Sequence, residues 1–408
     1  MGRGFAILLV ALLCGLLAGP SAAAHDKEAD VTATSAAPSS PLPQRLRERL
    51  RAAVVRGLRD SATPGLVVAV QTPDGRWVKA WGTANRRSLR PMRTIVHHRI
   101  GSVTKTFMGT LLMQLAADHE LSLSDTIDQY VDGVPNGDVI TLRQLADMTA
   151  GVASYTANPA FTDLLYADPE RPWQPNRLLE FGFADSPKFP PGTAFQYSDS
   201  NYILLGLAIE EAAGKPLRAV LRERITRPLG LNETSWPGSS IAMPKPHARG
   251  YTLQGQPADD PADATNWNPS YAWAAGEMIS TVDDLLTYGR ALGTGKGLLS
   301  RAQQKRRLAS FGDIPPLTPQ LTYGIGMVRD GGWLGHTGQV PGFTTALYYH
   351  PGIKATVVVE ANTDIPTGEC PDATLIDDPF DGPCALSADR IMGSIAGALH
   401  RPYQLPPG

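Results

Sequence analysis

Net charge is nearly absent from this sequence: 408 residues carry a formal charge of only −2 at pH 7. An even balance of this kind gives no electrostatic case for binding nucleic acid or an anionic membrane. Aromatic residues are also few, at 7% of the chain, and no run of basic residues interleaves with them. We therefore expect no nucleic-acid partner.

Long apolar segments are equally scarce. The run Phe5–Leu17 follows Arg3 and is too short to span a bilayer. Small residues that suit a cleavage site follow at 22–24, so residues 1–24 are predicted to be a secretory signal peptide. The protein should then be secreted or reside in the periplasm or cell envelope, with no integral membrane segment after cleavage.

Only three cysteines are present. Cys14 lies in the apolar run, and Leu13 precedes it where a lipoprotein signal would have a small residue, so no lipid anchor is expected. The mature chain keeps Cys370 and Cys384, an even number for an exported protein. A disulfide between them would close a loop rich in Pro and Asp. The alternative is two unpaired thiols, which an oxidising compartment disfavours.

Metal-binding patterns are missing too. His97 and His98 are neighbours, but no second group of ligands has the spacing of a zinc site. The sequence predicts neither a metal nor a cofactor.

What is present indicates a globular enzyme-sized chain, since 42% of residues are hydrophobic and 19% are charged. Residues 25–43 are rich in Ala, Ser, Thr and Pro and are predicted to be a flexible leader. The remaining residues, 44–405, are predicted to form one domain.

Strand patterns lie near both ends of that domain, and the middle is mostly helical. The predicted strands are 66–70, 77–81, 323–328, 344–350 and 355–361, and the predicted outer helices are 46–58 and 387–400. We expect an α/β (α+β) fold with one antiparallel sheet built from residues 60–101 and 320–400. Helices would flank this sheet, and a helical region at 102–319 would be inserted between its two halves.

The most informative stretch is the segment from Arg99 to Lys105. Ser102 and Lys105 stand three residues apart at the start of a helical pattern, so their side chains can meet. Ser102 alone is explained as a helix cap, but a lysine in the first turn opposes the helix dipole. Burial and the dipole both favour the neutral amine, which can accept the proton of a serine hydroxyl.

Two later stretches can supply partners. Tyr197 lies in a loop just before an apolar helix, where its hydroxyl could relay a proton. His336 lies between glycines in the stretch 335–338, before the strand that begins near Phe343. Taken singly, a loop tyrosine is far more often a packing residue, and the glycines are equally typical of a simple turn.

Together the three stretches resemble those of the serine β-lactamase and penicillin-binding protein superfamily, which carries Ser-x-x-Lys and two later elements. The similarity is greatest to class C β-lactamases, D-Ala-D-Ala carboxypeptidases and related esterases, and it covers about residues 44–400. It implies the β-lactamase/transpeptidase-like fold. It also implies that Ser102 is the acylated nucleophile, Lys105 its proton acceptor and Tyr197 the shuttle to the leaving group.

The same resemblance implies that His336, Thr337 and Gly338 orient the substrate. The backbone N–H of Ser102 and one from the strand after Gly338 would form the oxyanion hole. Acyl transfer would proceed by attack on an amide, lactam or ester carbonyl and then by hydrolysis of the acyl-enzyme.

Two positions depart from the family pattern. Asp199 stands where the second element has Asn, so it would favour the charged form of Lys105 and offers no amide donor. Asn201 could take over that donor role. Gln339 stands where carboxypeptidases have a threonine that holds the terminal carboxylate, and Arg329 is a candidate replacement.

We therefore predict an exported serine hydrolase that acts on D-alanyl peptides, as a carboxypeptidase does, or on β-lactams. The substrate would be a small molecule or a peptidoglycan peptide. The alternatives are an esterase of the same fold and a non-catalytic protein that binds penicillin or peptidoglycan.

Overall fold

The computed structural model describes residues 40–256, 260–312, 317–318, 320–368, 370 and 384–404. All of them belong to the compact unit Ala37–Gly408, which is separate from Met1–Ala36. The predicted signal peptide and residues 25–39 of the predicted leader lie outside the described residues. The last part of that leader does not fit the prediction, because Leu42 is buried and its N–H bonds to the carbonyl of Arg76.

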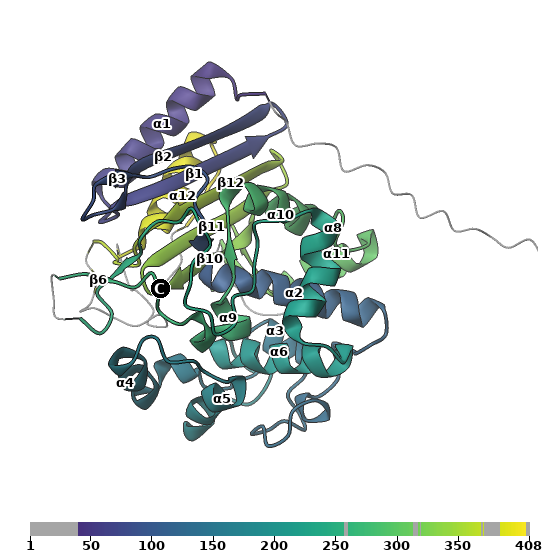
Figure 1. Cartoon of the computed structure of the whole chain (residues 1–408). Coiled ribbons are helices and arrows are strands. Elements are labelled where there is room, and N and C mark those ends of the chain that lie inside the picture. The colour runs from purple at the N-terminus through teal and green to yellow at the C-terminus, as the bar shows by residue number, and fades with distance from the viewer. Residues whose placement is uncertain are drawn as a thin grey trace, which may run out of the picture. The chain divides into compact units, whose positions relative to one another are not determined.

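The fold is organised around one antiparallel sheet of eight strands in the order β3-β2-β1-β12-β11-β10-β9-β8 (Figure 1). Its strands are β1 (Gly65–Thr72), β2 (Gly75–Asn85), β3 (Arg90–Pro91), β8 (Leu321–Gly324), β9 (Met327–Asp330), β10 (Trp333–Val340), β11 (Phe343–His350) and β12 (Ala355–Ala361). The two ends of the chain meet where β1 pairs with β12, with Leu66 opposite Ala361. The predicted α/β fold with a sheet built from both ends is confirmed.

One predicted strand is wrong in detail. Residues 323–328 do not form a single strand but belong to β8 and β9, which turn back on each other at Gly326. Gly326 has φ +63°, which favours glycine, and a Cβ there would lie 2.7 Å from the carbonyl oxygen of Lys105. The turn is thus also the point where the sheet edge meets the helix that carries Lys105.

Helices cover both faces of the sheet. On one face, α1 (Gln44–Arg59) and α12 (Ser387–Ala398) pack apolar side chains such as Leu50 and Ile391 against the sheet. On the other face, α2 (Thr104–Ala117) and α10 (Val282–Thr294) form part of the larger core. Helix α2 is buried along almost its whole length because Phe107, Leu111 and their neighbours leave few polar positions.

The region between the two sheet halves is mostly helical, as expected. Its helices and turns are η1 (Gly101–Val103), η2 (Ile127–Gln129), α3 (Leu142–Ala146), η3 (Tyr155–Ala157), α4 (Pro159–Ala167), α5 (Pro175–Ala184), α6 (Asp199–Ala213), α7 (Leu217–Leu221), η4 (Arg222–Thr226), α8 (Arg227–Leu229), η5 (Pro269–Tyr271), α9 (Trp273–Gly276), α11 (Arg301–Ala309) and η6 (Ser310–Gly312). Its short strand pairs are β4 (His98–Arg99) with β7 (Ile279–Ser280) and β5 (Tyr251–Thr252) with β6 (Ala262–Asp263).

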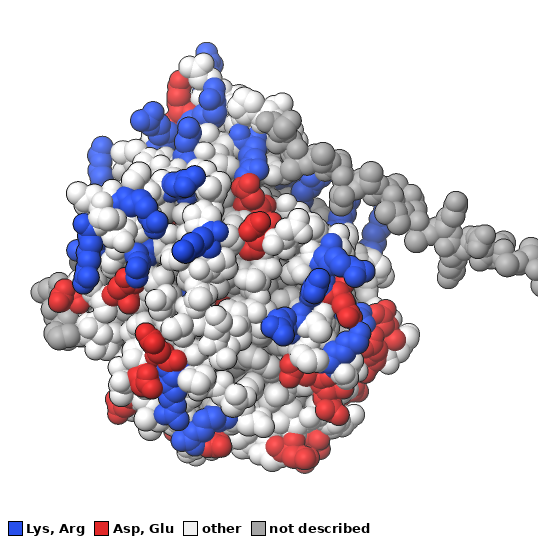
Figure 2. Space-filling view, viewed as in Figure 1, with Lys and Arg blue, Asp and Glu red and all other residues white. Residues whose placement is uncertain are grey.

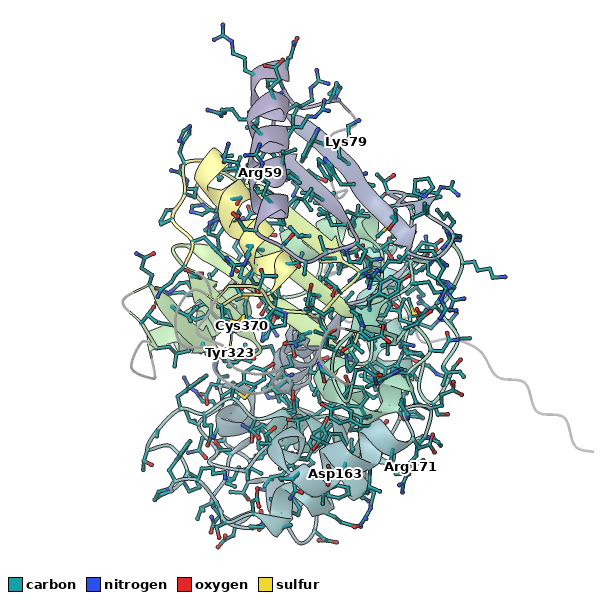
Figure 3. All side chains as sticks on the ribbon, turned by 90° about the vertical axis from the view of Figure 1, so that its left-hand side faces the viewer. Arg59, Lys79, Asp163, Arg171, Tyr323 and Cys370 are labelled. Carbon is teal, nitrogen blue, oxygen red and sulfur yellow. A yellow bond between two sulfur atoms is a disulfide. The ribbon has the colours of Figure 1, made fainter. Side chains whose placement is uncertain are left out.

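Charged residues are unevenly placed on the surface. Lys and Arg gather over α1, β2 and β3, whereas Asp and Glu are more frequent over the helical region (Figure 2). A view turned by 90° places Arg59 and Lys79 at one end and Asp163 and Arg171 at the other (Figure 3). Across the described residues, no helix has the length and apolar character needed to cross a membrane.

The structure joins Cys370 and Cys384 in a disulfide whose Cα atoms are 4.7 Å apart. The residues between them, 371–383, lie outside the described part of the chain.

Candidate active site

Ser102 lies in the short turn η1, between strand β4 and helix α2. The residue before it, Gly101, has φ +51°, and a Cβ there would come within 2.6 Å of the backbone nitrogen of Gln339. Only glycine fits this close approach between the turn and strand β10. The turn that carries the half-buried serine is therefore held against strand β10.

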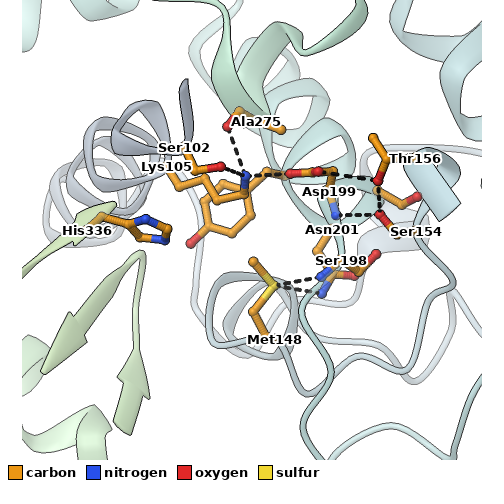
Figure 4. Close-up of polar contacts among 12 residues, drawn as sticks. Ser102, Lys105, Met148, Ser154, Thr156, Ser198, Asp199, Asn201, Ala275 and His336 are labelled. Atoms are coloured by element: carbon orange, nitrogen blue, oxygen red, sulfur yellow. Dashed lines mark hydrogen bonds and ion pairs between the residues drawn. The ribbon is translucent and has the colours of Figure 1, made fainter. Parts of the chain in front are cut away.

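Lys105 follows in the first turn of α2, and its side chain is fully buried. Its Nζ donates to Ser102 Oγ at 2.8 Å, to Asp199 Oδ1 at 2.5 Å and to the carbonyl oxygen of Ala275 at 2.9 Å (Figure 4). Three acceptors use all three hydrogens of an ammonium group. In this arrangement Lys105 is positively charged, and the Asp199 carboxylate is its counter-ion.

Asp199 begins helix α6 and is itself almost completely buried. Its backbone N–H donates to Ser154 Oγ at 3.0 Å, and its second carboxylate oxygen accepts from the hydroxyl of Thr156 at 3.4 Å. The hydroxyls of Ser154 and Thr156 are in turn 2.7 Å apart. These contacts fix the Asp199 carboxylate beside Lys105. The aspartate that stands where the family has asparagine is therefore in the centre of the site.

Tyr197 is two residues before Asp199 and is half-buried against the same group. Lys105 Nζ lies 4.8 Å from the centre of its ring, within the range of a cation–π contact. The ring centre of His336 is 6.1 Å from that of Tyr197. The structure thus brings together the serine, lysine, tyrosine and histidine that the sequence singled out.

His336 lies inside strand β10, not in a turn before a strand. Its Nδ1 is 2.5 Å from the carbonyl oxygen of Thr337, which can only accept, so Nδ1 carries the proton. Nε2 then accepts from the hydroxyl of Tyr323 at 3.0 Å. Burial, helped by the charge of Lys105, lowers the pKa of His336 to about 3, so the ring is neutral at ordinary pH.

Strand β10 also passes directly beside the turn that carries Ser102. A Cβ on Gly338 would lie 2.0 Å from the carbonyl oxygen of Ile100 and 3.1 Å from the nitrogen of Ser102. Val340 pairs with Phe343 across a two-residue turn. Hydrogen-bonding residues alternate along the β10–β11 pair. The backbone N–H and C=O of Gln339 therefore point away from β11 and towards η1, the turn that carries Ser102. The nitrogens of Ser102 and Gln339 thus border the same space.

Asn201 and Arg329, the two residues expected to compensate for the departures from the family pattern, lie apart from the Lys105 group. Asn201 does not take the place of the missing amide donor, because it is fully buried on α6 with its Nδ2 3.5 Å from Met148 Sδ. Arg329 is exposed on β9, with its guanidinium 4.9 Å from the centre of the Phe311 ring. Neither residue bonds to the Lys105 group.

The two neighbouring histidines have separate partners. His97 Nε2 lies 2.9 Å from Glu233 Oε2, and His98 Nε2 lies 3.1 Å from the carbonyl oxygen of Thr344. Within the described ranges, no group of His, Cys, Asp and Glu side chains is arranged to hold a metal ion.

Sequence reasoning missed four contributors to the site: the carbonyl of Ala275 and the hydroxyls of Ser154, Thr156 and Tyr323. A backbone carbonyl leaves no signature in a sequence. Ser154 and Thr156 lie 45 and 43 residues from Asp199, and Tyr323 lies 13 residues from His336. Nothing in their local pattern separates these three residues from core residues.

Behind the site, Arg99 and Glu277 hold the segments that carry Ser102 and Ala275. The Arg99 guanidinium donates to the carbonyls of Thr265 and Trp267, both at 3.2 Å. Glu277 Oε1 accepts from the backbone N–H of Gly238 at 3.1 Å, and burial raises the pKa of Glu277 to about 8. Both side chains are nearly inaccessible to solvent.

Comparison with known proteins agrees with this geometry. A putative penicillin-binding protein, PbpX of Bacillus subtilis, is 25% identical over 75% of this chain and 72% of its own length. A D-aminopeptidase of Cereibacter sphaeroides is 28% identical over 73% of this chain, which spans 57% of that protein.

Among solved structures, a D-stereospecific amidohydrolase from Streptomyces sp. superposes with a TM-score of 0.72 and 31% identity, covering 78% of this chain and 94% of that one. The family model described as Beta-lactamase matches residues 50–379, which is most of the chain. Sequence, fold and relatives agree, and the chain belongs to the beta-lactamase family of serine hydrolases.

Proposed function

We propose that this protein is an exported hydrolase that forms an acyl-enzyme at Ser102 and cleaves amide bonds of D-amino acid residues. The observation that carries the proposal is the position of Lys105 Nζ, buried between Ser102 Oγ at 2.8 Å and Asp199 Oδ1 at 2.5 Å. A serine next to a buried amine is the arrangement that activates a hydroxyl as a nucleophile.

The proton of Ser102 passes to Lys105 as the hydroxyl attacks the carbonyl carbon. For this step the lysine must first lose a proton, because all three of its hydrogens are engaged in the resting arrangement. Asp199 opposes that loss by stabilising the ammonium ion.

The tetrahedral intermediate needs donors for its negatively charged oxygen. The backbone N–H groups of Ser102 and Gln339 supply them, since both nitrogens border the space between η1 and β10. Tyr197 then delivers a proton to the leaving amine from its place beside Lys105. His336 is a positioning residue: its neutral ring, bonded on both nitrogens, fixes the wall against which Tyr197 lies.

The substrate class follows from the two departures and from the relatives. Asp199 adds a carboxylate where an amide would bind substrate, and Gln339 replaces the hydroxyl that would hold a terminal carboxylate. Such a site disfavours a substrate with a free C-terminal carboxylate and favours one with a free ammonium group. The names D-aminopeptidase and D-stereospecific amidohydrolase, given to two relatives, support D-aminoacyl amides as that class.

The nucleophile is tested by trapping. The purified protein is incubated with a fluorescent penicillin, and the adduct is located by mass spectrometry. We expect a single acylated residue, Ser102, and a loss of turnover of at least about 10³-fold in Ser102→Ala. Turnover that persists in this variant would show that another nucleophile acts.

The substrate class is tested by a panel of compounds. A D-alanyl p-nitroanilide with a free amine is compared with its N-acetyl form, its L-isomer, a D-Ala-D-Ala peptide, nitrocefin and a p-nitrophenyl ester. The proposal expects the first to be cleaved best. A preference for the ester would favour the esterase alternative, and an adduct without any turnover would favour a penicillin-binding protein.

A further inference from the structure

The end of the fold formed by α1, β2 and β3 carries a strongly basic surface, which we call the basic face. Its exposed members are Arg45, Arg47, Arg49, Arg51, Arg56, Arg59, Lys79, Arg86, Arg87, Arg90 and Arg93. Acidic residues in the same stretch are few: Glu48, Asp60 and Asp74. The near-zero charge of the whole chain therefore hides a positive end and a negative remainder (Figure 2).

These basic side chains are largely unneutralised. Among the described residues, no ion pair involves the basic side chains of α1, Lys79 or those of the β2–β3 turn. Arg59 and Lys79 lie at the same end of the fold in the second view as well (Figure 3). The basic face is thus a positive surface that is complementary to an extended anionic one.

One apolar side chain in this part of the chain is strongly exposed. Leu89, in the turn between β2 and β3, is 72% exposed, and Arg87 and Arg90 lie two positions before and one position after it in the sequence. Ile95 is 51% exposed, and Val55 on α1 is 37% exposed. The other large hydrophobic side chains that are exposed in the described chain are Val139 and Leu317.

Leu89 is also held in an unusual conformation. Its φ is +52°, a left-handed value that is uncommon for a bulky residue. The turn before it is fixed because Asn85 Oδ1 accepts the N–H groups of Arg87 at 2.9 Å and Ser88 at 3.0 Å. The N–H of Arg86 donates to Tyr251 Oη at 2.8 Å, which ties the turn to the rest of the fold. A rigid turn thus presents a leucine to solvent among arginines.

We propose that the basic face docks on a bilayer that contains anionic phospholipid, with Leu89 inserted among the lipid headgroups. Arginines around an exposed apolar side chain match such an interface, where charge attracts and the apolar group leaves water. A soluble polyanion would be attracted by the arginines, but it would offer no apolar surface for Leu89 to contact. This proposal departs from the expectation drawn from total charge, because it depends on how the charge is distributed.

The test is vesicle co-sedimentation with the chain from residue 25 onwards, which keeps the whole compact unit and lacks the apolar run near the N-terminus. Phosphatidylcholine vesicles with and without phosphatidylglycerol are compared at low and high salt. We expect binding only to the anionic vesicles, weakened by salt. The double variant Arg87→Glu/Arg93→Glu should bind at least about 25-fold more weakly, since each basic residue near such a surface contributes about fivefold.

Two matched variants control for charge and folding. Lys305→Glu/Arg306→Glu changes the same number of exposed charges on α11, outside the basic face, and should bind nearly as the parent does. Leu89→Asn should weaken binding about tenfold while leaving the unfolding temperature unchanged or raised, because Asn tolerates the left-handed conformation. Val139→Asn removes another exposed apolar side chain, 53% exposed and outside the basic face, and should bind as the parent does.

Insertion can be observed directly with a fluorophore. Leu89→Cys provides a single free thiol for an environment-sensitive dye, since Cys370 and Cys384 are joined. The dye should brighten on anionic vesicles, and the same dye on Val139→Cys should not. Equal binding to neutral vesicles would overturn the proposal. So would a finding that Leu89→Asn has no effect while polyphosphate displaces the protein, because the surface would then recognise a soluble polyanion.

Discussion

At the scale of single residues, Asp199 sets the character of the site. It places a negative charge 2.5 Å from Lys105 in a position sheltered from solvent, where charge interactions are weakly screened. The pair is electrically neutral as a whole. In the proposed mechanism the same carboxylate influences the charge of the preferred substrate.

Asp199→Asn should therefore change the selectivity, because the variant keeps the shape of the side chain and removes its negative charge. The preference for a free-amine over an N-acetyl D-alanyl anilide should fall about tenfold, which corresponds to about 1.4 kcal/mol. Steady-state kinetics with both substrates measure this effect, and Asp163→Asn, an exposed change on α4, is the control. An unaltered preference would show that Asp199 takes no part in substrate selection.

Tyr323 provides a second test at this scale. Its hydroxyl donates to Nε2 of the neutral, buried His336, so Tyr323→Phe leaves that nitrogen without its donor. We expect the free energy of unfolding to fall by about 1–3 kcal/mol. Chemical denaturation measures this loss. If stability is unchanged, His336 has another partner or another tautomer.

At the scale of elements, much could be predicted from sequence, because periodicity and turn residues are local. The helix expected at 46–58 is α1, and the strands expected at 66–70 and 77–81 lie inside β1 and β2. The prediction of one strand at 323–328 was wrong because the apolar residues Tyr323 and Val328 suggest a single strand. The turn between β8 and β9 brings Gly326 against α2, and this tertiary contact cannot be read from the local sequence pattern.

In the candidate site, too, contacts within one turn could be predicted from sequence, whereas contacts that depend on tertiary packing could not. Ser102 and Lys105 are neighbours along one turn, so their contact follows from helical spacing. Asp199 and His336 were assigned from the resemblance, but their contacts depend on how α6 and β10 pack against α2. Asn201 and Arg329 were reasonable candidates by residue type, and only packing shows that they bond elsewhere.

The contact between β10 and η1 gives a prediction for this scale. Gly338→Ala places a Cβ 2.0 Å from a backbone carbonyl, which cannot rotate away as a side chain can. The strand or the turn must shift, so activity should fall at least about 100-fold, because small displacements of catalytic groups are costly. Gly397→Ala on α12, where nothing lies within 4 Å of the new Cβ, should keep full activity. Comparable activity in both variants would contradict the close approach.

At the scale of the whole molecule, buried ionisable groups set the pH dependence of stability. Burial raises the pKa of Asp330 and Asp389 to about 7 and that of Glu277 to about 8. It lowers the pKa of His98 and His336 to about 3. The carboxyl groups bind protons more tightly in the folded state than in the unfolded state, and the histidines bind them less tightly.

Stability should therefore rise as the pH falls from about 8.5 to about 6.5, because the folded carboxyls take up protons that the unfolded chain does not. Below about 6.5 the unfolded histidines take up protons that the folded ones refuse, which opposes the rise. Thermal unfolding at a series of pH values measures the trend. Asp330→Asn should flatten the upper part of the curve, and a stability that increases steadily with pH would contradict the assignment.

The pairing of β1 with β12 has a consequence for the newly made chain. During synthesis, the hairpin of β1 and β2 emerges early, together with Ser102 and Lys105 on their turn and helix. The sheet stays incomplete until β12 follows near the other end, and contacts between such distant segments form slowly. Because β10 is also made late, Ser102 meets this strand only after most of the chain has been synthesised. The nascent protein thus passes most of its synthesis with an unassembled site.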